Sequence, residues 1–131
     1  MFLDSNIFIY AYLGQGKQGA DSKRLIERIH KGEQKATTST LVTDEVLFYF
    51  LMHRDKEFAK KIWYNILDNP NLKILAVDEK VARAVMQYVD EGLEPRDAFH
   101  AATVEVYGLN TICSYDKGFD KIQNIKRQEP K

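Results

Sequence analysis

Short apolar stretches alternate with longer segments of helical periodicity along the chain. Phe2-Leu3 predicts a short buried strand, and the apolar run from Ile7 to Leu13 predicts a helix that ends at Gly14-Gln15-Gly16. The segment from Ala20 to Lys31 repeats apolar residues at helical spacing and closes on a lysine followed by a glycine. The first part of the chain therefore predicts a strand followed by two helices.

The same alternation continues through the middle of the chain. Thr37-Thr38-Ser39 predicts a second short strand, and apolar residues recur at helical spacing from Leu41 to Phe50. Asp55 is a candidate N-cap for a long helix, which Asn69-Pro70-Asn71 terminates. This region predicts one more strand and two more helices.

The last third of the chain predicts two further strands. One runs from Leu72 to Val77, and Asp78 then caps a helix that extends to Gly92. Pro95 suits the first position of the next helix, which Gly108 ends before the strand Thr111-Ile112-Cys113. The tail near Glu129-Pro130-Lys131 is expected to be loose.

Strands that alternate with helices over short connections predict an α/β fold, with a mostly parallel central sheet and helices on both faces. The chain has 131 residues, 44% of them hydrophobic and 29% charged, which is enough to bury a core without disulfides or a structural zinc. It contains no repeat, linker or low-complexity tract. We therefore expect one domain over residues 1–131.

The charge balance and the single cysteine narrow the setting in which the protein works. The formal net charge is zero, so any polyanion must be held by a local patch or by bound metal. Cys113 is the only cysteine, which excludes an intramolecular disulfide and indicates a reducing compartment. The sequence lacks a secretory signal and any apolar run near the roughly 20 residues of a membrane span. We expect a cytoplasmic protein without membrane contact.

Four acidic residues lie where predicted strands end or helices begin: Asp4, Glu45, Asp97 and Asp116. Asp4 follows the first strand, Asp116 follows the last, and Asp97 opens the helix that leads into that last strand. Parallel sheets bind ligands at the carboxyl ends of their strands, so these acids are expected to meet at one edge. Glu45 lies on an otherwise apolar helix face, where a carboxylate needs a partner.

Four carboxylates in one place repel one another unless a cation neutralises them. Mg²⁺ and Mn²⁺ prefer oxygen ligands, and they activate water and stabilise charge on a phosphodiester. The set therefore predicts a Mg²⁺ or Mn²⁺ site for phosphodiester hydrolysis. Taken singly, Asp4 is equally suited to cap a helix, Asp97 to favour a helix dipole and Asp116 to begin a turn.

Other chemistries find little support in the sequence. The three histidines, His30, His53 and His100, have no second ligand at zinc-binding spacing, which favours surface or core roles. Cys113 lies in an apolar strand and is interpreted as a buried structural thiol. The chain has no glycine-rich phosphate loop and no serine nucleophile elbow.

With these residues in place, the chain resembles the PIN-domain family, and within it the VapC-type toxins of toxin–antitoxin pairs. The resemblance spans essentially the whole chain and rests on four blocks: Phe2-Leu3-Asp4-Ser5-Asn6, Thr43-Asp44-Glu45-Val46, Arg96 to Ala102, and Thr111 to Phe119. It implies a Mg²⁺- or Mn²⁺-dependent ribonuclease that commonly dimerises and that pairs with an antitoxin.

The resemblance also assigns roles to particular positions of this sequence. Asp4, Glu45, Asp97 and Asp116 carry over as the catalytic and metal-binding acids. Supporting positions, which orient or extend the acidic group, are Ser5, Asn6, Ser114 and Asp120. RNA would be held by basic residues at the rim: Arg96 is the first choice, and the weaker candidates are Lys17, Lys23, Arg24, Lys117 and Lys121. Tyr10, Tyr12 and Tyr49 are candidates for stacking on bases or for core packing.

Two alternatives to a toxin ribonuclease remain open at this point, and a third is disfavoured. The same fold could act in ribosomal RNA processing or RNA decay, or it could be a non-catalytic interaction module that presents a helix to a partner. A phosphatase of the haloacid dehalogenase type also begins with a strand and an aspartate. That class requires a second aspartate two residues later, where this chain has Asn6.

Overall fold

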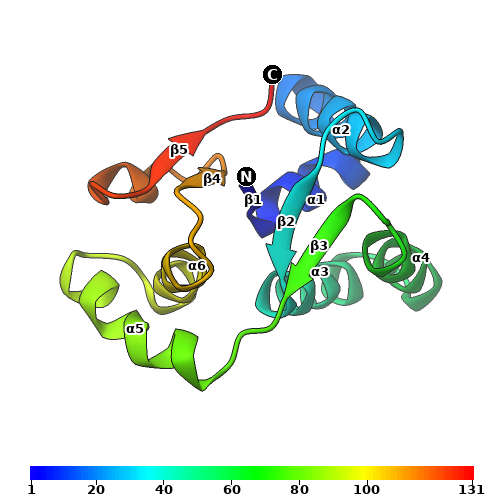
Figure 1. The fold of residues 1–131 in the computed structure, drawn as a ribbon. Helices are drawn as coiled ribbons and strands as arrows, with labels where there is room; N and C mark the ends of the chain where they lie inside the picture. The colour runs from blue at the N-terminus through cyan, green and yellow to red at the C-terminus, as the bar shows by residue number, and fades with distance from the viewer.

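Five short parallel strands form the central sheet, in the order β3-β2-β1-β4-β5 (Figure 1). The computed structural model describes residues 1–131. Every neighbouring pair of strands is parallel, so the expected parallel sheet is confirmed. The strands are β1 (Phe2–Leu3), β2 (Ala36–Ser39), β3 (Leu72–Leu75), β4 (Thr111–Cys113) and β5 (Lys126–Gln128).

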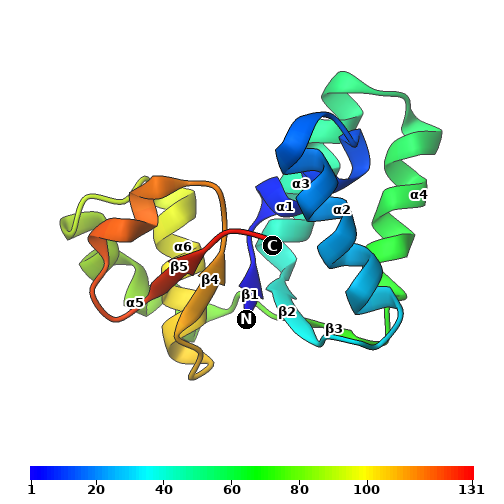
Figure 2. The same cartoon turned by 90° about the horizontal axis from the view of Figure 1, so that it is seen from above.

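Helices cover both faces of the sheet, as the sequence predicted (Figure 2). One face carries α1 (Ser5–Leu13), α2 (Gly16–His30), α3 (Thr40–His53) and α4 (Lys56–Leu67). The other carries α5 (Glu79–Asp90), α6 (Pro95–Val106) and the short 3-10 helix η1 (Lys117–Lys121). Right-handed crossovers explain this division, because the chain moves outward from β1 through β2 to β3 and then returns to the opposite side of β1.

Local sequence sets most of the helix ends. Asp55 and Asp78 each accept a backbone N–H bond from the residue three positions on, at 2.8 and 3.1 Å, so both predicted caps are confirmed. Pro95 occupies the first position of α6. Gly14 ends α1 with a φ of 67°, a left-handed conformation that favours glycine.

Small residues let α6 approach the sheet closely. Ala98, Ala101 and Ala102 are fully buried, and the ring of His100 on the same helix lies 5.9 Å from the ring of Phe2 in β1. Because α6 runs antiparallel to the strands, its first turn lies at their carboxyl ends (Figure 2). The packing of α6 thus brings Asp97 to the predicted edge of the sheet.

The sequence-based expectation was wrong for the C-terminus. The final residues form the edge strand β5, in which Gln128 pairs with Cys113, and Arg28 donates a hydrogen bond of 3.2 Å to the carbonyl of Lys131. Pro130 is buried, so the tail is fixed rather than loose. The polar sequence of β5 hid the strand, because an edge strand has no need of apolar residues on both faces. No helix combines the length and the apolar character needed to cross a membrane.

Candidate active site

The four predicted acids lie at the carboxyl edge of the sheet, on both sides of β1. Asp4 directly follows β1, and Asp116 follows β4 after two intervening residues. Glu45 lies on the second turn of α3, and Asp97 on the first turn of α6. The chain leaves β1 toward β2 and later returns to β4, so this edge is a switch point in strand order, where parallel sheets bind ligands.

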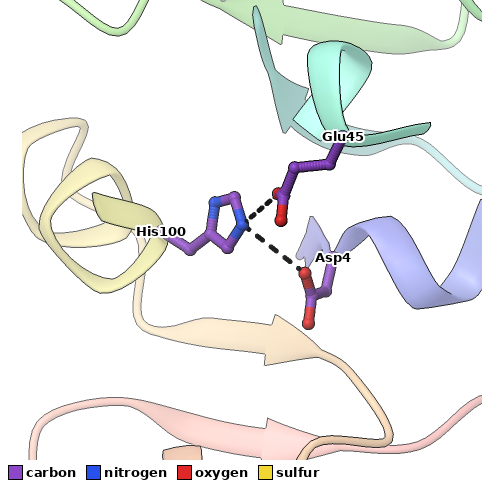
Figure 3. A group of neighbouring side chains, drawn as sticks. All are labelled: Asp4, Glu45 and His100. Atoms are coloured by element: carbon purple, nitrogen blue, oxygen red, sulfur yellow. Dashed lines mark hydrogen bonds and ion pairs between the residues drawn. The ribbon is translucent and has the colours of Figure 1, made fainter. Parts of the chain in front are cut away.

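Asp4, Glu45 and His100 form the centre of the site (Figure 3). One ligand atom from each lies within 4.8 Å of the others. Nε2 of His100 is 2.5 Å from Oε1 of Glu45 and 3.7 Å from Oδ1 of Asp4. In Figure 3 the imidazole comes from α6 and points between the two carboxylates. His100 is therefore the partner that Glu45 needed on its apolar helix face.

Asp97 and Asp116 form the second part of the site. Burial raises the pKa of Asp97 from 3.8 to about 7, and hydrogen bonding to Asp116 and the charges of Asp116 and Asp4 add to the rise. The charge of His100 acts in the opposite direction. The charges of both Asp4 and Asp116 therefore act on Asp97, which links the two parts into one group. We call this group the site cluster; it consists of Asp4, Glu45, Asp97, His100 and Asp116.

Asp4 is the most buried of the acids, with 4% of its surface exposed. Burial raises its pKa, although His100 and a hydrogen bond from Ser114 act against the rise. One carboxylate oxygen accepts the backbone N–H of Ser5 at 2.7 Å. The other accepts Oγ of Ser114 at 2.6 Å and Nδ2 of Asn6 at 3.2 Å. These donors fix the direction in which the carboxylate faces.

Ser114 connects the ends of β1 and β4. Its hydroxyl donates to Asp4 and accepts bonds from Nδ2 of Asn6 at 3.1 Å and from the backbone N–H of Asp116 at 3.0 Å. Oδ1 of Asn6 in turn accepts the backbone N–H of Tyr115 at 3.3 Å. In this structure Asn6 and Ser114 therefore hold the Asp4 carboxylate in place, and the functional roles that the resemblance implies for them stay a prediction.

Replacing Ser114 by alanine is expected to weaken binding of Mn²⁺ by about 10–100-fold, as is typical when a residue that orients a metal ligand is lost. The buried carboxylate of Asp4 would lose its shortest side-chain donor. Ser5→Ala is the matched control, because the Ser5 hydroxyl is 3.4 Å from the same carboxylate and its stronger contact uses the backbone. Calorimetric titration with Mn²⁺ measures both variants, and equal affinities would contradict the orienting role.

The structure does not bring Asp120 to the site cluster. Its carboxylate accepts bonds from Nε and Nη2 of Arg127 at 2.8 and 3.3 Å, and this guanidinium lowers its pKa. The pairing was not predicted, because Arg127 lies in β5, a strand that the apolar periodicity did not indicate. The carboxylate of Asp120 instead holds η1 against β5.

His100 is the site residue that sequence reasoning overlooked. Its core location agrees with the prediction, since it is fully buried, but its contact with two acids was not foreseen. A signal was present, because His100 follows Asp97 by three residues and helix positions i and i+3 share a face. Burial alone would lower the pKa of His100, whereas its bond to Glu45 and the charges of Asp4, Glu45 and Asp97 raise it above the ordinary value.

Arg96 is exposed beside the site cluster, at the rim of an open groove of about 460 Å³. We call this the α3–α6 groove, because residues from the first turns of both helices line it. They are Thr40, Leu41, Asp44, Val77, Pro95, Arg96 and Phe99. Asp44 and Arg96 directly precede Glu45 and Asp97, so the groove is lined by the same helix turns that carry these acids.

Of the other basic residues predicted to contact RNA, two pair with an acid and three are exposed. Lys17 and Arg24 both pair with the buried carboxylate of Asp21. Lys23, Lys117 and Lys121 are exposed.

The tyrosines considered for base stacking pack within the protein. The ring of Tyr10 packs edge-on against Tyr115 with 5.3 Å between the ring centres, and Tyr49 stacks on His53 with 4.2 Å between the ring centres. Tyr12 is half-buried, and burial raises its pKa. Cys113 is buried as predicted, which raises the pKa of its thiol to about 12.

The chemistry of the site cluster fits a divalent cation. Its ligand atoms are mostly carboxylate oxygens, which suit Mg²⁺ and Mn²⁺. Burial and the charges of Asp116 and Asp4 raise the pKa of Asp97, and a bound cation would offset both effects. The site therefore offers both the ligand type and the charge that such an ion requires.

Comparison with known proteins agrees with this fold. The family model described as "PIN domain" matches residues 1–125. The chain belongs to the PIN domain family, and the resemblance seen in the sequence is confirmed.

Individual relatives span nearly the whole chain. Ribonuclease VapC2 of Methanocaldococcus jannaschii is 26% identical over 96% of this chain and 91% of its own length. Among solved structures, Mycobacterium tuberculosis VapC20, described as a sarcin-ricin loop cleaving toxin, has a TM-score of 0.78, with 14% identity and 98% of each chain covered. A toxin-antitoxin complex from Klebsiella pneumoniae has a TM-score of 0.69 and 16% identity, over 95% of this chain and 93% of that one. The solved structures share the fold described above.

Proposed function

We propose that the protein is a metal-dependent endoribonuclease that hydrolyses RNA phosphodiester bonds with Mg²⁺ or Mn²⁺ as cofactor. The observation that carries the proposal is the convergence of acids from distant parts of the chain: ligand atoms of Asp4, Glu45 and His100 lie within 4.8 Å of one another, and the charge of Asp116 acts on Asp97. Membership of the PIN domain family and a relative named as a ribonuclease support it.

Three acids of the site cluster have stated tasks in this proposal. Asp4 and Glu45 would hold the ion, with the direction of Asp4 fixed by Ser114. The carboxyl group of Asp97 would give up its proton when a cation neutralises the cluster, because its pKa is raised to about 7 by burial and by Asp116. When bound, the ion supplies an activated water and stabilises the charge that develops on the phosphodiester. Purified protein should cleave RNA with Mg²⁺ or Mn²⁺, and addition of EDTA should stop it.

Arg96 is the residue we propose to hold the RNA backbone, since it is exposed at the rim of the α3–α6 groove next to Asp97. Arg96→Ala should weaken RNA binding at low salt and reduce the slope of log affinity against log salt by about 0.7. Lys31→Ala is the control, because Lys31 is exposed at the far end of α2. Salt-dependent binding to a single-stranded RNA measures both, and equal slopes would argue against Arg96 as a phosphate contact.

We further propose that the chain is the cytoplasmic toxin of a toxin–antitoxin pair and that its apolar surface binds an antitoxin or a second copy. The exposed apolar side chains gather on α3 and α4, where Phe48, Met52 and Tyr64 are each more than half exposed. Exposed apolar patches commonly mark interaction sites. The solved toxin-antitoxin complex from Klebsiella pneumoniae, which shares this fold, supports this part of the proposal.

A growth assay tests the toxin role separately from the chemistry. Expression of the chain alone should arrest growth, and expression together with the product of the neighbouring gene should restore it. Asp4→Asn should be harmless in the same assay. An RNA-processing nuclease would cleave RNA in solution without this rescue, so active protein that leaves growth unaffected would favour that alternative.

A further inference from the structure

We propose that His100 is a positioning residue, which donates its Nε2–H to Glu45 and does not itself bind the metal ion. The inference rests on the proposed function in one respect, because it takes Glu45 as a metal ligand. It assigns the one nitrogen atom in the site cluster to orienting a carboxylate rather than to coordination.

The contacts of His100 favour a hydrogen bond to a single acid. Its Nε2 atom is 2.5 Å from Oε1 of Glu45, whereas Oδ1 of Asp4 is 3.7 Å away and beyond hydrogen-bond reach. In Figure 3 this nitrogen lies between the two carboxylates, and the Glu45 oxygen is the nearer of the two. A carboxylate has two oxygens, so the bond to Oε1 leaves Oε2 of Glu45 free for an ion.

The other ring nitrogen distinguishes the two roles. Nδ1 of His100 is buried and has no hydrogen-bond partner. A metal-bound histidine almost always donates its second N–H to a carboxylate, a carbonyl or water, and orphaned buried N–H groups are rare. A neutral ring with its proton on Nε2 avoids an orphaned donor, because Nδ1 is then only an acceptor. The surroundings of the ring thus suit a donor to Glu45 better than a ligand.

The bond also joins two elements that the sheet keeps apart. Glu45 lies on α3, on one face of the sheet, and His100 lies on α6, on the other (Figure 2). The imidazole is held by close packing of α6, with its ring 5.9 Å from that of Phe2. A rigid donor from the opposite layer can therefore fix the direction of the Glu45 side chain.

Nitrogen spectroscopy of the unmodified protein tests the assignment directly. With ¹⁵N-labelled histidine at alkaline pH, where the ring is neutral, NMR should show the His100 ring protonated at Nε2 and bare at Nδ1, and Mg²⁺ should leave that pattern in place. Pulsed EPR of Mn²⁺-loaded protein should show no nitrogen coupling to the ion. Loss of the Nε2 proton on adding Mg²⁺, or a histidine nitrogen coupled to Mn²⁺, would overturn the proposal.

Two amide variants separate positioning from packing. Glutamine can place an N–H near the position of Nε2, whereas asparagine carries the same group but is too short to reach Glu45. His100→Gln should bind Mn²⁺ within about threefold of the unmodified protein, and His100→Asn should bind about 10–100-fold more weakly. Equal affinities of the two variants would overturn the positioning role. Failure of the unmodified protein to bind Mn²⁺ at all would instead contradict the proposed function, and the NMR pattern without metal would still decide the His100–Glu45 bond.

Discussion

Replacing Asp97 by asparagine should lower Mg²⁺-dependent RNA cleavage by at least about 10²-fold, the usual loss when a preorganised electrostatic group is removed. The change preserves the size of the side chain and its place in the first turn of α6. It removes the charge by which Asp97 and Asp116 together would attract a cation. RNA cleavage by purified protein measures the effect, with circular dichroism to check the fold.

The same substitution should make the metal-free protein more stable. Burial and Asp116 raise the pKa of Asp97 to about 7, so at pH 8 the folded state is penalised for holding this group ionised. Removing the charge should increase the free energy of unfolding in EDTA by about 1–2 kcal/mol, after a discount for solvent screening. Asp90→Asn at the end of α5 is the control and should change neither property. A well-folded Asp97→Asn protein with full activity would contradict the role of the acid.

The affinity for Mg²⁺ or Mn²⁺ should rise by about tenfold from pH 6 to pH 8, because an ion must displace the proton of Asp97 at the lower pH. Calorimetric titration with Mn²⁺ at the two values measures this directly. Proton release should accompany binding near pH 6 and largely disappear at pH 8. An affinity that does not change with pH would show that Asp97 does not take part.

The stability of the metal-free protein should move in the opposite direction. Asp4, Asp97 and His100 all have pKa values raised in the folded state: burial is the cause for both acids, and the neighbouring acids are the cause for His100. Groups of this kind stabilise the fold at low pH, and their contribution is lost as pH rises through the folded pKa. The metal-free protein should therefore unfold more easily at pH 8 than at pH 6, and Mg²⁺ should raise the melting temperature more at pH 8. Thermal unfolding in EDTA and in Mg²⁺ at both values is the check.

Much of the fold could be predicted because its signals are local. The caps Asp55 and Asp78, the proline at the start of α6 and the 3.6-residue periodicity all act within a few residues of the chain. The convergence of Asp4, Glu45, Asp97 and Asp116 could also be anticipated from their positions at strand ends and helix starts. In a parallel sheet these positions necessarily share one edge.

Features that depend on distant partners could not be predicted in the same way. Arg127 in β5 pairs with Asp120, and neither residue shows this in its own segment. Asp21 is buried in α2 and pairs with Lys17 and Arg24, a contact that their own segment did not indicate. The bond from His100 to Glu45 joins helices from opposite faces of the sheet, and only the packing of both layers determines it.

The chemical nature of the RNA ends tests the central claim most directly. If water attacks the phosphodiester at a cation held by Asp4 and Glu45, cleavage should require Mg²⁺ or Mn²⁺ and leave 5′-phosphate and 3′-hydroxyl ends. Asp4→Asn should abolish these products. Cleavage that continues in EDTA and leaves 2′,3′-cyclic phosphate ends would mean that the RNA 2′-hydroxyl is the nucleophile, and it would contradict the account.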